Sequence, residues 1–229
     1  MSNLTNHLSV VISDAILCLT ITFLIIKILK HRRNCSKPAV LRSFVGFSIF
    51  SALGASSGAI YHLLEDNLSG RNKFLLWMPV KYTLALSSYF TAMLVVHTHY
   101  KAKSNRVLSQ IFLIKTSFWI GLLTYQSGFL WTAVDFLTTT VFSIIICAYF
   151  YFKHRHSHSS LLLVGWILGL GGVVLQVLKV TVSDVYFNNN DLFHLLAAIS
   201  TVFIYLATDL YLVETKEELL LTSDDTINV

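Results

Sequence analysis

Long apolar runs separated by short polar links dominate the pattern of this chain. A helix needs about 20 apolar residues to cross the core of a bilayer, and each run is about that long. The runs are continuous stretches of Leu, Ile, Val, Phe and Ala rather than alternating segments, so they predict helices and not a membrane barrel. The seven predicted spans are residues 8–30, 40–64, 75–96, 107–124, 128–150, 161–181 and 192–213.

The short links favour one compact all-α bundle over two domains, with a single seven-helix transmembrane domain at residues 1–213. The link at residues 125–128 predicts that the fourth and fifth spans form an antiparallel hairpin. Pro79 is expected in the first turn of the third span, where its missing N–H would have no partner in any case. Residues 214–229 form a predicted acidic cytoplasmic tail.

Composition supports an integral membrane protein. Apolar residues make up 55% of the chain and charged residues only 13%, whereas a soluble domain has roughly 25% charged residues. The chain therefore has too little polar surface to coat a soluble globule. This balance excludes a soluble enzyme, a secreted disulfide scaffold, a coiled coil and a disordered chain.

Basic residues set the predicted orientation, because positively charged links stay in the cytoplasm. The first, third and fifth links hold 11 lysines and arginines, against Arg71 and Lys73 in the second link and none in the fourth or sixth. The N-terminus is therefore predicted to be outside or lumenal and the C-terminus cytoplasmic. The net charge of +5 then reports topology and not nucleic-acid binding. Surface histidines are expected in the fifth link, at His154, His156 and His158.

Ionisable side chains within the spans each need a reason, because inserting one costs roughly 2.5–3.5 kcal/mol. Long lysines near a span end reach the interface easily, but the short side chains of Asp14 and Asp135 do not. By the predicted topology seven ionisable residues share the outer half: Asp14, His62, Lys81, Asp135, Lys179, Asp191 and His194. We predict an outward-facing polar cavity, and the alternative is a set of wet helix ends.

Helical spacing supports the cavity interpretation. One face of the sixth span holds Gly165, Gly169, Gly172, Gln176 and Lys179, which are three or four residues apart. A similar stripe in the second span is Ser51, Ala55, Gly58 and His62. Small residues at this spacing allow helices to approach closely, so packing without any site is the alternative for each stripe.

Metal binding and proton transfer are the chemistries open to these residues. A catalytic zinc commonly has three protein ligands and a water whose pKa falls to about 7. His62 and His194 would supply two ligands, and Asp191, Asp135 or Asp14 an oxygen ligand. The alternative is that both histidines are hydrogen-bonded parts of a buried interface.

Two segments, GAIYHLL at 58–64 and YFNNNDLFHLLAAIS at 186–200, resemble the CREST superfamily of seven-helix membrane proteins. That group includes the alkaline ceramidases and the adiponectin and progestin receptors, and an uncharacterised branch shares the Asn-Asp-aromatic-His opening of the last helix. The resemblance implies a zinc ion held by His62 and His194, and in hydrolase members a metal-bound water that cleaves a lipid amide. The chain departs from the family at Asn189 and Asn190, which occupy the place of a further histidine ligand.

Three functions are open on this basis. The first is a zinc-dependent hydrolase of a lipid amide or ester, with Asp191 and Asp135 as its catalytic carboxylates. The second is a non-enzymatic, receptor-like protein that binds a lipid or a small apolar ligand in the cavity. The third is an ion- or proton-coupled transporter, against which stands the lack of an inverted repeat. For all three functions, membrane lipids are the expected partners of the chain.

Overall fold

The computed structural model describes residues 2–32, 35–126, 129–183 and 187–224, and the side chains within them except those of residues 2–7, 102 and 215–224. In this part of the chain the fold is all-α. The helices are α1 (Ser2–Arg32), α2 (Pro38–Leu64), α3 (Gly70–His99), α4 (Ala102–Tyr125), α5 (Phe129–His154), α6 (Ser157–Val177) and α7 (Asn189–Asp224). A 3-10 turn, Glu65–Asn67, follows α2, and an isolated bridge joins Ser183 to Phe187 before α7.

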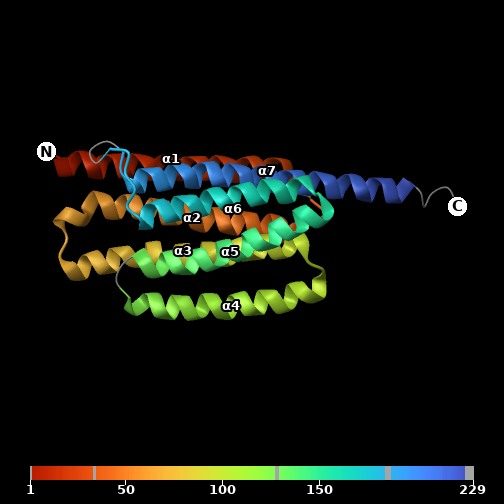
Figure 1. Cartoon of the computed structure of the whole chain (residues 1–229), viewed down its shortest axis with the longest axis horizontal. Coiled ribbons are helices and arrows are strands. Elements are labelled where there is room, and N and C mark those ends of the chain that lie inside the picture. The colour runs from red at the N-terminus through yellow and green to blue at the C-terminus, as the bar shows by residue number, and fades with distance from the viewer. Residues whose placement is uncertain (1, 33–34, 127–128, 184–186, 225–229) are drawn as a thin grey trace.

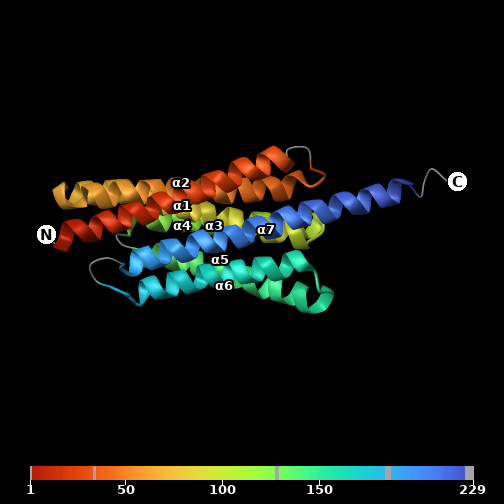
Figure 2. The same cartoon turned by 90° about the horizontal axis from the view of Figure 1, so that it is seen from above.

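Six of the helices form a closed ring. α1 packs on α2, α2 on α3, α3 on α5, α5 on α6 and α6 on α7, and α7 returns to α1. All of them run along the long axis of the molecule, and α7 continues past the others toward the C-terminus (Figure 1, Figure 2). The interior of this ring is where buried polar and apolar side chains from distant parts of the sequence meet.

α4 lies outside the ring, at the edge of the bundle (Figure 1). It runs antiparallel to α5, as the short link between them predicts, but it packs mainly on α3 and makes few contacts with α5. Residues 127–128 of that link lie outside the described residues. The position of α4 therefore depends on contacts with α3 and on a few long side chains, which are described below.

Six of the described helices are long and apolar enough to cross a membrane, namely α1, α2, α4, α5, α6 and α7. They indicate an integral membrane protein, and large apolar side chains on their outer faces, such as Leu19 and Ile114, are 70% exposed. α3 is 30 residues long but is not among the six. Its buried residues include Lys81, Ser88 and Thr91, so these polar side chains of α3 face other helices. That α3 crosses the membrane as a further span stays a prediction.

Two helices extend beyond the apolar runs that predicted them. α3 begins at Gly70, so Pro79 lies inside the helix and not in its first turn, which corrects the expectation. Thr83 Oγ1 donates a hydrogen bond of 2.7 Å to the Pro79 carbonyl. α7 continues to Asp224, so the predicted tail begins as helix, while residues 225–229 lie outside the described residues. Helical hydrogen bonding does not stop where hydropathy falls, because polar residues extend a helix equally well outside the apolar core.

The α6 glycines of the predicted stripe, Gly165, Gly169 and Gly172, lie against α7, and this is the close helix contact that their spacing predicts. A Cβ on Gly165 would lie 2.8 Å from Cγ1 of Ile204 and 3.2 Å from the backbone oxygen of Ser200. Ser200 Oγ donates a 2.7 Å hydrogen bond to the Gly165 carbonyl, and a Cβ on Gly169 would lie 3.2 Å from that hydroxyl. The two backbones thus approach too closely for a side chain at Gly165.

We predict that Gly165→Ala lowers the stability of the protein by about 1–3 kcal/mol, the usual cost of overpacking a well-packed contact. The matched control is Gly171→Ala in the same helix, where an added Cβ meets nothing within 4 Å and helix propensity favours alanine. Thermal unfolding in detergent measures both. Equal unfolding midpoints for the two variants would contradict the close α6–α7 contact.

Candidate functional site

A pocket of about 420 Å³ lies inside the ring, with walls from α1, α2, α3, α5, α6 and α7. Most of its walls are apolar and aromatic, and Asp14, Gln176 and His194 lie on its walls where α7 begins. The whole α2 stripe lines it: Ser51, Ala55, Gly58 and His62. The small residues of the α2 stripe therefore leave room for the pocket as well as allowing close contact between helices. Because the walls are mainly apolar, the outward-facing polar cavity expected from the sequence stays a prediction.

His194, near the start of α7 and only 8% exposed, contacts α1 through both ring nitrogens. Its Nδ1 lies 2.9 Å from Ser13 Oγ, and its Nε2 lies 3.2 Å from Asp14 Oδ1. Asp191, one turn earlier on α7, accepts hydrogen bonds from Ser13 Oγ at 2.8 Å and from Ser9 Oγ at 2.9 Å. Asp191 and His194 thus meet at one place, as their spacing predicts, and the group that joins them is a serine that the sequence did not single out.

Asp14 is a buried carboxylate on the pocket wall. It is 1% exposed, and neither of its oxygens accepts a hydrogen bond from the described residues. His194 Nε2 is within ion-pair distance but does not meet hydrogen-bond geometry. On the side of α2, a Cβ on Gly58 would lie 3.3 Å from Asp14 Oδ2. A buried polar atom without a partner is rare in proteins, so this carboxylate needs an explanation.

His62 also lines the pocket, but its closest polar contact is local. Nδ1 lies 3.2 Å from Glu65 Oε1, one turn further along the chain, and the ring packs edge-on against Trp77 with centroids 6.4 Å apart. Within the described ranges, no three His, Cys, Asp or Glu side chains are grouped so that they could hold a metal ion. The zinc site on His62 and His194 therefore stays a prediction.

The two asparagines that depart from the resemblance pack against the end of α6. Gln176 Nε2 donates to Asn190 Oδ1 at 2.9 Å, and Asn189 Nδ2 donates to the Gln176 carbonyl at 3.4 Å. Gln176 Oε1 is buried without a partner among the described residues. Lys179, which also lines the pocket, lies in the turn after α6 with a positive φ of 54°. Besides Asp14, the pocket therefore has a second buried group with an unsatisfied acceptor, the Gln176 side-chain oxygen.

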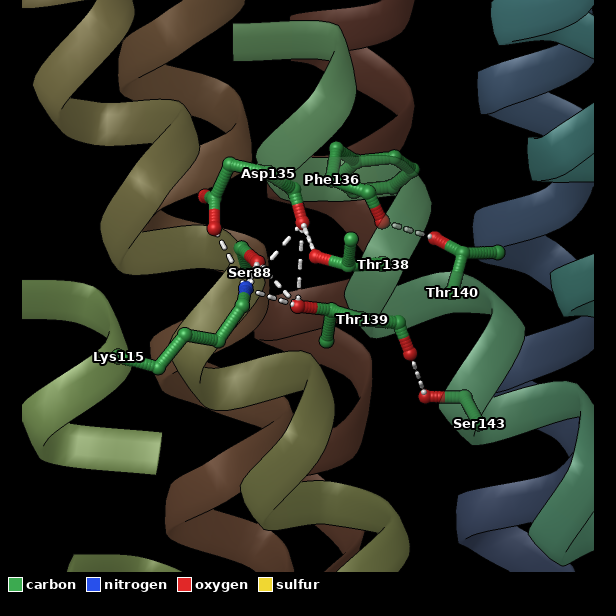
Figure 3. Close-up of polar contacts among 8 residues, drawn as sticks. All are labelled: Ser88, Lys115, Asp135, Phe136, Thr138, Thr139, Thr140 and Ser143. Carbon is green, nitrogen blue, oxygen red and sulfur yellow. Dashed lines mark hydrogen bonds and ion pairs between the residues drawn. The ribbon is translucent and has the colours of Figure 1, made fainter. Parts of the chain in front are cut away.

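Asp135, the other predicted catalytic carboxylate, belongs to a separate cluster between α3, α4 and α5 (Figure 3). Lys115 Nζ on α4 lies 2.5 Å from Asp135 Oδ1 and 2.6 Å from Thr139 Oγ1. Thr139 shares a 2.7 Å hydrogen bond with Ser88 of α3. The neighbouring residue Phe136 lines the pocket, whereas the Asp135 side chain turns toward Lys115. The two predicted carboxylates thus occupy different places.

Lys81 binds the C-terminal end of α4. It is fully buried, and its Nζ donates to the carbonyl oxygens of Leu123 at 2.7 Å and Gln126 at 2.8 Å. The ammonium also lies 4.5 Å from the centre of the Phe74 ring. A cation at the C-terminal end of a helix is favoured by the unpaired carbonyls there. Lys81 and Lys115 therefore both bind α4 to the ring instead of reaching for the interface.

Charged pairs at the opposite end of the bundle join α7 to its neighbours. Arg32 Nε and Nη2 contact the two oxygens of Asp209 at 2.7 and 3.2 Å. His158 Nδ1 lies 2.8 Å from Glu214 Oε2, and its ring stacks on His156 at 5.0 Å. The expectation of a surface histidine is wrong for His158, which is 5% exposed. α6 begins at Ser157, and its first turn points residue 158 at α7.

Residues 9–211 match a family of unknown function, DUF6962. The chain belongs to this family. The matched region contains every residue of the pocket and of the Lys115 cluster, so both are parts of the family's domain. No curated protein matches the chain. The CREST resemblance, which rests on two short segments, stays a prediction.

We predict that Lys115→Met destabilises the protein by about 3 kcal/mol, because it leaves the buried Asp135 carboxylate without its counter-charge. The double variant Lys115→Met/Asp135→Leu should recover at least half of that loss, since it removes the orphaned charge as well. The control is Lys153→Met, because Lys153 is exposed and its described contacts are with Tyr149 of the same helix. Denaturant unfolding in mixed micelles measures the three variants, and a double variant no better than the single one would contradict the ion pair.

Proposed function

We propose that this chain is an integral membrane protein that binds a lipid or a small apolar molecule in the pocket inside its helix ring. The pocket carries this proposal, because its volume of about 420 Å³ falls within the roughly 300–1,000 Å³ of small-molecule sites. Such sites combine mainly apolar walls with a few convergent polar groups. Here Asp14, His194 and Gln176 are those groups.

The side chains grouped at the pocket favour binding over hydrolysis. A catalytic zinc takes three protein ligands, but no three His, Cys, Asp or Glu side chains of the described residues are grouped so that they could hold a metal ion. Asp135 is held by Lys115 in another part of the bundle. The described donors thus do not fit the three-ligand site implied by the CREST resemblance. The zinc-dependent hydrolase stays an alternative that requires a third ligand to come together with His62 and His194.

The separation of Asp14 from Asp135 also argues against a transporter. A proton relay needs titratable groups in contact or joined by bound water, but Asp14 lies in the pocket while Asp135 is occupied by Lys115 and Thr139. In the topology that the basic links predict, α3 also crosses the membrane, which makes seven spans, and the N-terminus is outside or lumenal. The polar end of the pocket then lies in the outer half of the membrane.

A ligand that binds the folded protein stabilises it, by about 2.7 kcal/mol at 100 times its Kd. We therefore expect 1-dodecanol, a simple apolar probe with one hydroxyl, to raise the unfolding midpoint of the detergent-purified protein in a saturable manner. Ala55→Phe should remove this shift, because Ala55 lies on the pocket wall. Leu53→Phe is the matched control on the same helix, because Leu53 is 48% exposed. A shift that is equal in both variants would place the probe outside the pocket.

Metal content separates binding from the hydrolase alternative. We expect protein purified without chelators to hold less than one zinc ion per chain when measured by inductively coupled plasma mass spectrometry. The reason is that no three potential metal ligands are grouped together in the part of the chain that the structure describes. Stoichiometric zinc that disappears in a His62→Ala/His194→Ala double variant would overturn the proposal in favour of the hydrolase.

A further inference from the structure

Among the buried polar side-chain atoms of the described pocket-lining residues that have no partner, three are acceptors and one, Trp166 Nε1, is a donor. Both oxygens of Asp14 and Oε1 of Gln176 are buried and accept no hydrogen bond from the described residues. All three atoms belong to residues that line the same pocket. Burying a carboxylate without partners costs several kcal/mol, so the folded protein gains much from any donor that enters.

The hydrogen bonds around Ser13 leave a further acceptor beside Asp14. Ser13 has a single hydroxyl proton and two oxygen acceptors within reach, the Val10 carbonyl at 2.9 Å and Asp191 Oδ1 at 2.8 Å. It donates to one of them, so the 2.9 Å contact with His194 Nδ1 needs the ring to donate. A neutral imidazole that donates from Nδ1 presents a lone pair at Nε2. This lone pair lies 3.2 Å from Asp14 Oδ1, so with Asp14 ionised two acceptors face each other with no proton between them.

We infer that the ligand of this pocket carries a cationic amine, whose N–H groups bind the Asp14 carboxylate and Nε2 of His194 while its apolar part fills the space beside α2. This inference rests on the proposed function, because it names the class of molecule that the pocket takes. An ammonium group supplies three N–H donors and a positive charge, whereas a hydroxyl supplies one donor and no charge.

Other charged groups at the pocket do not neutralise Asp14. Lys179 also lines it, but its side chain is exposed and no ion pair joins it to Asp14 among the described contacts. His62 has its own acid, Glu65, at 3.2 Å. When it is ionised, the carboxylate of Asp14 is therefore the anionic centre available to a ligand.

The test compares probes that differ only in the head group, on the full-length protein in one nonionic detergent at pH 7. Dodecylamine should bind the wild-type protein at least tenfold more tightly than 1-dodecanol, measured by isothermal titration calorimetry. Dodecyltrimethylammonium has the same charge but no N–H, and it should bind no more tightly than the alcohol. Asp14→Asn should reduce the preference for the amine at least tenfold, and the matched control Asp209→Asn, at the far end of α7, should keep it.

The stability of Asp14→Asn without ligand gives an independent readout. The asparagine amide supplies a donor toward His194 Nε2, so the variant should unfold at the same temperature as the wild type or at a higher one. If this variant fails to fold, the comparison of dodecylamine with dodecyltrimethylammonium on the wild-type protein still decides whether N–H donors are required.

The outcomes separate the two proposals. Saturable binding of dodecylamine and 1-dodecanol with equal affinity overturns the amine and leaves the binding pocket standing. Absence of saturable binding for every probe overturns both. Binding of 2-phenylethylamine as well as dodecylamine identifies a free amine as the natural class, whereas binding of dodecylamine alone identifies an amphiphile with an amine head group.

Discussion

Inside an apolar bundle every polar group must find its partner within the protein, because lipid offers none. This constraint organises the structure of this chain. Lys81 reaches the last carbonyls of α4, and Lys115 reaches Asp135 and Thr139. Arg32 and Asp209 join α1 to α7 at the opposite end. The helices are thus joined by polar contacts that specify which helix lies beside which, while apolar side chains facing lipid specify little.

Asp14 is an exception to this constraint, and it marks the candidate site of the bundle. The same burial that fixes Lys115 in one place leaves this carboxylate without a donor, at the edge of a pocket that small residues of α2 keep open. The surrounding groups are well ordered by their own contacts, with Asp191 holding two serines and His194 lying against both Ser13 and Asp14. A site preorganised in this way needs little rearrangement to take a ligand, which favours affinity.

The sequence predicted what depends on spacing within one helix and missed what depends on neighbours. The apolar runs located the helices, the α2 stripe predicted a common face that lines the pocket, and the interval from Asp191 to His194 predicted that they meet. Ser13 escaped notice because a serine in an apolar run gives no signal of its own. The pairing of Lys115 with Asp135 was equally hidden, since it depends on where α4 packs. The prediction for His158 was wrong because the exact residue at which α6 begins decides the direction of this side chain.

The position of α4 has a consequence for biosynthesis. Translation proceeds from the N-terminus, so Lys115 enters the membrane before Asp135 has been made. A helix with a lysine near its middle inserts poorly alone, and its partner on α5 arrives 20 residues later. α4 and α5 are therefore expected to leave the translocon together, with the ammonium neutralised during insertion. The ring of six helices would then close around its pocket only after α7, the last of these six to be synthesised, has reached α1.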